Sequence, residues 1–137
     1  MDPQALARFC RDHHVEMLYA FGSRAKQAMS LAAGSSSIHA SPDSDLDIGV
    51  KVSVNGRADV REKSLMALEL EELFEAPRVD LVFLHEADPF VAANVIRGER
   101  LFAVDTHDAD EYELYVLRRA GDCAPLERER LALIEGS

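Results

Sequence analysis

The amino-acid sequence predicts an α/β domain, because short apolar runs typical of strands alternate with longer amphipathic segments typical of helices. The strand-like runs are mostly apolar and lie at residues 15–21, 46–54, 79–84 and 101–104. The chain has 137 residues, a length that suits one domain, and 47% of them are hydrophobic, which is enough for a buried core. Residues 1–137 are therefore expected to form a single domain.

The first element predicted is a helix close to the N-terminus. Asp2 followed by Pro3 is typical of a helix start, and this helix is expected to end near His13. The next run, residues 15–21, is short and apolar and stops at Gly22. This pattern favours a buried strand that enters a tight turn.

A second helix is predicted directly after this turn, with Ser23 as its cap. Residues 31–44 are rich in Ser, Gly and Ala and are therefore expected to form a flexible surface insert. The chain then resumes with a strand at 46–54, an amphipathic helix at 57–75 and a third strand at 79–84.

The C-terminal part is predicted to be largely helical. Pro89 favours the start of a helix that stops near Gly98, and a short strand follows. A long helix is expected from about Thr106. Pro125 is expected to interrupt it, so that residues 125–137 form a separate C-terminal helix or tail.

Composition excludes several classes of protein. The formal net charge of −10 repels phosphate backbones and disfavours a nucleic-acid partner, whereas a nucleotide accompanied by a divalent cation is compatible with it. Cys10 and Cys123 show neither zinc-ligand spacing nor a disulfide framework. No run approaches the about 20 apolar residues that cross a bilayer, so we expect a cytoplasmic protein without a membrane partner.

Gly22 and Ser23 are a candidate phosphate cradle. They lie where a predicted strand ends and a helix begins, so free backbone N–H groups and the serine hydroxyl can face an anion. Arg24 and Lys26 follow, and a cation there could hold the outer phosphates of a nucleoside triphosphate. A Gly-Ser pair is also common in turns that merely end a strand, and this alternative stays open for the pair taken alone.

Asp45 and Asp47 are candidate metal ligands at the start of the second predicted strand. The two-residue period of a strand puts both carboxylates on one face, with Gly49 next on that face to leave space beside a metal. Two neighbouring acids repel each other, which a hard cation such as Mg²⁺ would relieve. The alternative is that the segment is only a polar entry to a strand.

Asp80 is the third candidate ligand, because it interrupts a strand otherwise made of apolar residues. A carboxylate inside a sheet is costly without a partner. If its strand lies beside the strand of Asp45 and Asp47, the three acids converge as a two-metal site, with Asp80 placed to accept the proton of an attacking hydroxyl. The alternative is a carboxylate near a strand end that reaches solvent.

Taken in order, these motifs resemble a known signature. GS at 22–23, SDLDIGV at 44–50 and VDLVFL at 79–84 are similar to the nucleotidyltransferase pattern of the DNA polymerase beta superfamily. Within it the chain most resembles the minimal nucleotidyltransferase (MNT) antitoxins, which are about this short and accompany HEPN-domain toxins. The resemblance implies a small mixed sheet of about four strands with flanking helices.

The resemblance also implies a function. It predicts an adenylyltransferase that moves AMP from ATP to a hydroxyl acceptor, a tyrosine of a HEPN toxin, with two Mg²⁺ ions held by Asp45, Asp47 and Asp80. The protein would then be the antitoxin of a toxin–antitoxin pair. Two alternatives stay open: an antitoxin that neutralises its partner by binding alone, and nucleotidyl transfer to a small molecule, which would call for a homo-oligomer.

One feature departs from the family pattern. The segment between Ser23 and Asp45 is markedly longer than the roughly ten residues that usually separate these motifs, and it is expected to form an excursion at the rim of the site. Basic residues after Ser23 are also sparse, with only Arg24 and Lys26 before the insert. The grip on a triphosphate could therefore be weaker, or completed by the loop or a partner.

Overall fold

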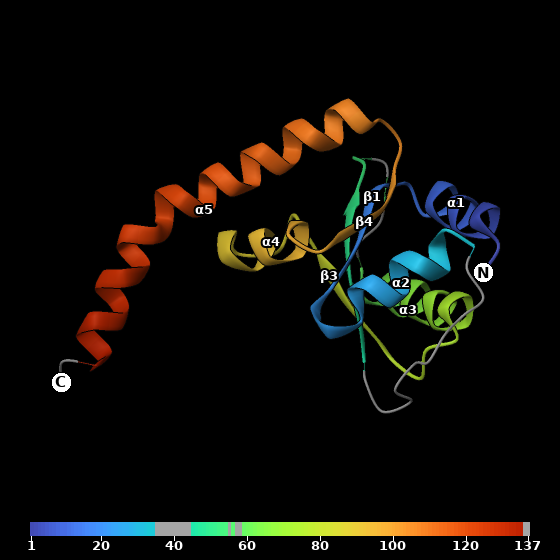
Figure 1. Cartoon of the computed structure of the whole chain (residues 1–137), viewed down its shortest axis with the longest axis horizontal. Helices are drawn as coiled ribbons and strands as arrows, with labels where there is room; N and C mark the ends of the chain where they lie inside the picture. The colour runs from blue at the N-terminus through green and yellow to red at the C-terminus, as the bar shows by residue number, and fades with distance from the viewer. Residues whose placement is uncertain (35–44, 55, 57–58, 136–137) are drawn as a thin grey trace.

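The computed structural model describes residues 1–34, 45–54, 56 and 59–135, with side chains described up to residue 125. Figure 1 shows a central sheet with helices on both of its faces and a long C-terminal helix that reaches past the rest of the domain. The elements are α1 (Pro3–Asp12), β1 (Val15–Phe21), the short 3₁₀ helix η1 (Gly22–Arg24), α2 (Ala25–Ala32), β2 (Leu46–Val52), α3 (Val60–Phe74), β3 (Val79–Phe83), α4 (Pro89–Ile96), β4 (Glu99–Ala103) and α5 (Thr106–Glu135).

The sheet has four strands in the order β3-β2-β1-β4. Strand β1 runs antiparallel to both β2 and β4, whereas β2 and β3 are parallel. Both the α/β class and the small mixed sheet of four strands are thus confirmed. Strand β1 lies inside the sheet, which explains why the run 15–21 is almost continuously apolar.

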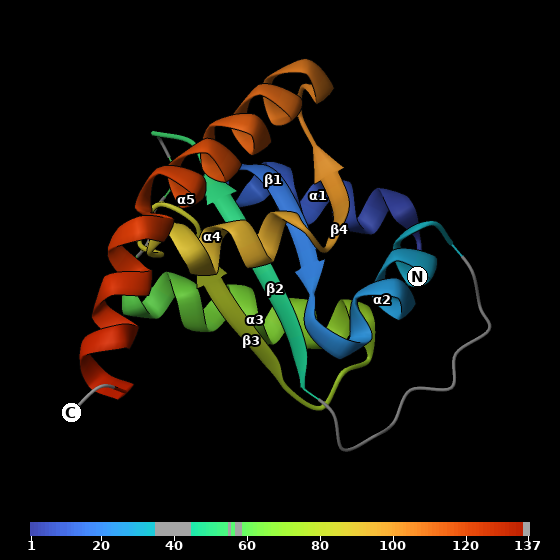
Figure 2. The same ribbon diagram turned by 60° about the vertical axis from the view of Figure 1, so that its left-hand side comes forward.

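Two hydrophobic cores lie on opposite faces of this sheet, and Figure 2 shows the helices that cover each face. Helices α1, α2 and α3 cover one face, with Phe9, Leu31 and Leu70 among the buried residues. Helices α4 and α5 lie on the other face, where Val95 and Val116 belong to the second core together with Met17 and Tyr19 of β1. Because successive side chains of a strand point to opposite faces of the sheet, strand β1 contributes residues to both cores.

Aspartates cap four of the helices. Asp2 accepts a hydrogen bond from the backbone N–H of Gln4, and Asp59 accepts one from Glu62. Asp88 and Asp105 accept two each, at the starts of α4 and α5. These carboxylates satisfy N–H groups that have no partner within the helix. They fix where α1, α3, α4 and α5 begin.

The structure corrects the expectation for the second helix. Ser23 lies inside the 3₁₀ turn η1, whose N-cap is Phe21, and α2 begins only at Ala25 without a side-chain cap. The positive φ of 77° at Gly22 turns the chain before a helix cap is reached. Helix α2 continues to Ala32, so the predicted insert at 31–44 starts too early, and its residues 35–44 lie outside the described residues.

The expectation that Pro125 interrupts the long helix and separates residues 125–137 from it is wrong. Helix α5 runs from Thr106 to Glu135 with this proline inside it. A proline removes one hydrogen bond and tends to bend a helix rather than always ending it, and α5 changes direction along its length in Figure 1. The first half of α5 is anchored to the sheet, because Tyr19 of β1 donates a 2.9 Å hydrogen bond to Glu113.

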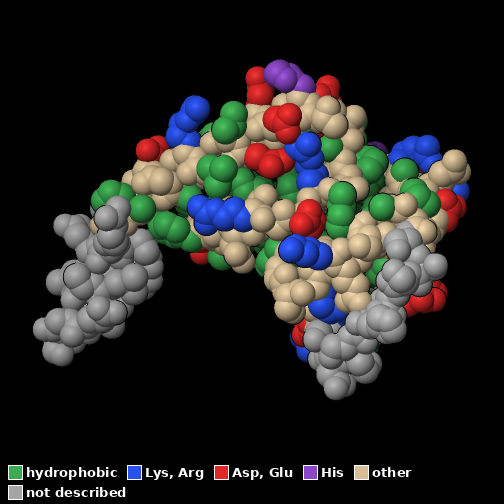
Figure 3. Space-filling model, in the orientation of Figure 1, with side chains coloured by type: hydrophobic (Ala, Val, Ile, Leu, Met, Phe, Trp, Pro, Cys, Tyr) green, Lys and Arg blue, Asp and Glu red, His purple; other side chains and the backbone are tan. Residues whose placement is uncertain are grey.

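Charge and hydropathy of the described part agree with the composition. On the face shown in Figure 3, acidic and basic side chains are interspersed, without a continuous basic stripe. No helix among the described residues is long and apolar enough to cross a membrane.

Candidate active site

Three side chains from three neighbouring strands form a row at one end of the sheet. Asp47 of β2 lies opposite Phe21 of the antiparallel strand β1 and in register with Asp80 of the parallel strand β3. Residues directly opposite each other in a sheet project from the same face, so both carboxylates and the Phe21 ring lie on the face covered by α4. Asp45, two residues before Asp47, extends this face beyond the end of β2.

The carboxylates at this end of the sheet affect one another. Partial burial raises the pKa of Asp47, and the negative charges of Asp80 and Asp45 raise it further. The side chain of Arg78 counters part of this charge, because its Nε atom lies 3.6 Å from Asp80 Oδ1 and 4.0 Å from Asp45 Oδ2. Three acids and one arginine leave an excess of negative charge that favours a cation.

The donor set suits Mg²⁺, although the side chains are not gathered around a single point. Among the residues that the structure describes, no three His, Cys, Asp or Glu side chains lie close enough together to hold a metal ion. Asp45 and Asp80 are drawn to Arg78, and their side chains are 44% and 46% exposed, so both are free to turn toward Asp47. Carboxylate oxygens are the ligands that Mg²⁺ takes in proteins, which makes these three residues the ones that would hold it.

Gly22 brings the chain directly against this acidic group. Its φ of 77° is in the left-handed region, and a Cβ atom at this position would stand 2.5 Å from Asp47 Oδ2. Both facts require glycine. The turn after β1 is thereby adjacent to the carboxylates of β2.

The residues predicted to bind phosphate differ in where they lie. Ser23 is exposed at the turn, and Lys26 is exposed one turn later without an ion pair to any described residue. Arg24, by contrast, is only 6% exposed, and its Nε atom donates a 3.1 Å hydrogen bond to Gln27. The structure therefore brings Gly22, Ser23 and Lys26 together at the surface, whereas the Arg24 side chain is buried and hydrogen-bonded to Gln27.

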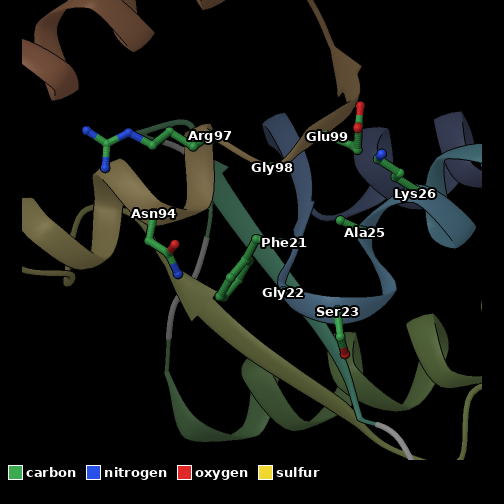
Figure 4. A pocket seen from close by; sticks show the side chains of 9 residues that line it. All are labelled: Phe21, Gly22, Ser23, Ala25, Lys26, Asn94, Arg97, Gly98 and Glu99. Carbon is green, nitrogen blue, oxygen red and sulfur yellow. The ribbon is translucent and has the colours of Figure 1, made fainter.

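A cavity of about 340 Å³ opens beside this turn, as Figure 4 shows. This volume is typical of pockets for small molecules. The cavity is lined by Phe21, Gly22, Ser23, Ala25, Lys26, Asn94, Arg97, Gly98 and Glu99. Gly22, Ser23 and Lys26 thus lie against this cavity, and Gly22 is also adjacent to Asp47.

Gly49 has a different role from the one expected. A Cβ atom at this position would collide with the Cγ1 atom of Val95 on α4. The space on this face beside Asp47 is therefore filled by α4 and not left for a metal. Gly49 instead sets how closely α4 packs on the sheet.

Sequence reasoning missed several residues of this site. Arg78 could have been found from its spacing, since it stands two positions before Asp80 and two-residue spacing puts side chains on one face of a strand. Asn94 is a polar residue within the otherwise apolar segment PFVAANVI, which was a usable signal. Gly98 was expected only as the stop of a helix, and its close approach to β1 gave no signal because it is a contact with a distant strand.

The site thus combines acidic residues on two neighbouring strands with a glycine-containing turn and a cavity of small-molecule size, all at one end of the sheet of an α/β domain. The family model of polymerase beta nucleotidyltransferases matches residues 4–107, and the chain belongs to this family. None of the curated protein sequences compared with the chain matches it.

Solved structures have the same fold. A chain of a toxin–antitoxin complex solved with AMP-PNP is 22% identical, with a TM-score of 0.66 over 99% of this chain and 98% of that chain. A chain of the MntA-HepT toxin–antitoxin complex is 20% identical, with a TM-score of 0.63 over 98% and 94% of the two chains. A chain from the tri-AMPylated Shewanella oneidensis HEPN toxin in complex with its MNT antitoxin is also 20% identical, with a TM-score of 0.63 over 98% and 93%.

Proposed function

We propose that this protein is a Mg²⁺-dependent adenylyltransferase that modifies a HEPN-domain toxin and thereby acts as its antitoxin. The observation that carries the proposal is the register of Asp47 with Asp80 on parallel strands, beside the Gly22 turn. Membership of the nucleotidyltransferase family supports nucleotidyl transfer as the reaction. The order of the motifs along the chain and their meeting at one end of the sheet agree with it.

The reaction is a displacement at the α-phosphorus of ATP. The oxygen of the acceptor hydroxyl forms a bond to this phosphorus while the bond from the phosphorus to the bridging oxygen of the β-phosphate breaks, and pyrophosphate leaves. The carboxylate of Asp80 accepts the hydroxyl proton, while Gly22, Ser23 and Lys26 hold the outer phosphates. Bound Mg²⁺ supplies positive charge that offsets the charge developing on the phosphate oxygens.

The structural neighbours support a protein as the acceptor. They come from toxin–antitoxin complexes, and in one of them the HEPN toxin is AMPylated. Transfer to a tyrosine of such a toxin needs no large acceptor pocket in this chain, since the partner supplies its own surface. We assign the cavity of about 340 Å³, whose size is in the range of small-molecule sites, to the nucleotide alone.

The test is to incubate the protein with ATP labelled at the α-phosphate, Mg²⁺ and its HEPN partner, and to measure label retained on the partner. We expect labelling that requires Mg²⁺ and that falls at least about 100-fold in Asp47→Asn, because this change removes a charged ligand of the metal. Asp12→Asn is the matched control. It makes the same change at the end of α1, which packs on the other face of the sheet, and it should leave labelling unchanged.

Two outcomes would overturn the proposal. If Asp47→Asn neutralises the toxin as well as the wild-type protein does, the chain acts by stoichiometric binding. If label appears only on added small-molecule acceptors and not on the toxin, the acceptor class is wrong.

A further inference from the structure

The cavity beside the Gly22 turn has two chemically different ends. Ser23 and Lys26 lie on the side of η1 and α2, where a hydroxyl and a cation suit phosphate oxygens, and Glu99 of β4 also lines the cavity on this side. Phe21 and Asn94 lie at the other end, and in Figure 4 the aromatic ring and the amide point toward one another from β1 and α4. A ring and an amide are not phosphate ligands.

We propose that Phe21 and Asn94 form the binding site for the nucleobase. The base packs on the Phe21 ring, and the Asn94 amide forms hydrogen bonds with the edge of the base. This inference rests on the proposed function, because it takes the ligand of the cavity to be the nucleotide of that reaction. It adds the two residues that recognise the base, which the sequence motifs do not identify.

The chemistry of both side chains fits a base. An aromatic ring offers a face on which a base stacks. The amide of asparagine carries a donor and an acceptor side by side, the pattern that pairs with the N6 amino group and the neighbouring ring nitrogen of adenine. Asn94 is exposed, and its side chain makes no hydrogen bond to another described residue, so the amide is available to a ligand.

The position relative to the acids also fits. Phe21 lies opposite Asp47, with Asp80 on the strand beyond, so the backbones of Phe21 and Asp47 are about one strand spacing, or about 5 Å, apart. An α-phosphate bound near Asp47 would therefore be adjacent both to Phe21 and to the turn at Gly22 that leads to Ser23. One nucleotide can fill these places together.

The fold holds α4 close to β1 at this point. Gly98, which follows α4, lies so near β1 that a Cβ atom there would collide with the carbonyl oxygen of Ala20 and stand 2.9 Å from the Cα atom of Phe21. The close approach of these two backbones keeps the end of α4, and with it Asn94, next to the Phe21 ring. Phe21 and Asn94 are thus positioned by packing that does not involve the ligand.

The experiment measures binding of ATP, GTP and inorganic tripolyphosphate, each with Mg²⁺, to the full chain by calorimetry. For Asn94→Ala and for Phe21→Leu we expect ATP affinity to fall about tenfold while tripolyphosphate affinity is unchanged, because only contacts to the base are lost. For Asn94→Asp the ratio of ATP to GTP affinity should shift about tenfold toward GTP, since a carboxylate accepts from two donors on the guanine edge and repels the ring nitrogen of adenine.

Two variants separate the base from the phosphates. Lys26→Ala should weaken ATP, GTP and tripolyphosphate by the same factor, because it removes a phosphate contact. Val91→Ala, exposed on the same helix α4 and outside the cavity lining, should change none of them.

The inference is overturned if Asn94→Ala and Phe21→Leu leave ATP affinity unchanged, if they weaken tripolyphosphate as much as ATP, or if the chain binds no nucleotide. Thermal unfolding of Phe21→Leu shows whether it is folded, and Asn94→Ala, at an exposed position, does not depend on that control. ATP binding that depends on Asn94 without AMP transfer to the partner would overturn the proposed function and leave this inference standing.

Discussion

The carboxylate of Asp47 lies against the backbone of Gly22, where a Cβ atom would stand 2.5 Å from its Oδ2 atom. This contact joins the turn that follows β1 to the neighbouring carboxylates Asp47 on β2 and Asp80 on β3. It places a predicted phosphate cradle and a predicted metal ligand in direct contact, although 24 residues lie between them in the sequence.

The first prediction concerns Gly22→Ala. The added Cβ would push the Asp47 carboxylate away, and the φ of 77° would cost a residue other than glycine about 1–2 kcal/mol. We expect the affinity for Mg²⁺-ATP to fall at least about tenfold, measured by calorimetry. Gly121→Ala is the control, because nothing lies within 4 Å of a Cβ there, and this change should leave binding intact. Unchanged binding in Gly22→Ala would contradict the prediction.

The second prediction concerns the cation that already lies at the acids. Arg78 contacts Asp80 and Asp45, so it competes with a metal ion for their oxygens. Arg78→Gln should lower the Mg²⁺ concentration that gives half of the maximal rise in Tm by about two- to fivefold, the size expected from exposed ion pairs. Arg8→Gln, an exposed arginine paired with Asp2 on α1, should have no such effect. An unchanged or higher Mg²⁺ requirement in Arg78→Gln would count against this competition.

The third prediction concerns the packing of α4 on the sheet. Gly49→Ala would drive a methyl group into the side chain of Val95, and overpacking of this kind typically costs about 1–3 kcal/mol. Denaturant unfolding should show this loss in the free energy of unfolding. The double variant Gly49→Ala/Val95→Ala should be less destabilised than the sum of the two single variants, because the space vacated by Val95 accepts the new methyl group. Additive losses would show that the two positions are not in contact.

The fourth prediction is a dependence of stability on pH. The two ring nitrogens of His13 form hydrogen bonds with Glu62 and Glu69, at 2.7 Å from Nδ1 to Glu62 Oε1 and 2.9 Å from Nε2 to Glu69 Oε2. These hydrogen bonds connect the C-terminal end of α1 to α3. Burial lowers the pKa of His13, but the hydrogen bonds and charges of Glu69 and Glu62 outweigh it, so the pKa is raised above the ordinary value of 6.5.

A raised pKa in the folded state means that the stabilisation is fully present below about pH 6.5 and is lost as the pH rises through the folded-state value. The Tm of the wild-type protein should therefore exceed that of His13→Gln by more at pH 6 than at pH 9. A difference that stays constant across this range would exclude His13 as the titrating group.

Much of the fold could be predicted from local patterns. The apolar run at 15–21 and the aspartates that cap α1 and α4 are signals within a few residues, and the elements they indicate are present. The errors arose where local rules compete. Pro125 usually ends a helix but is accommodated inside α5, and Ser23 favours a helix cap but lies in a 3₁₀ turn set by Gly22.

By itself the sequence determined the candidate ligands Asp45, Asp47 and Asp80, because the two-residue period of a strand and the cost of a lone carboxylate in an apolar run are local facts. Only the tertiary structure decided that Asp47 pairs in register with Asp80. Gly49 likewise serves the packing of α4, and Asn94 reaches the cavity beside β1. The physical reason is that these are contacts between segments far apart in the chain, and such contacts are fixed by how the helices pack on the sheet and not by the spacing of residues within any one element.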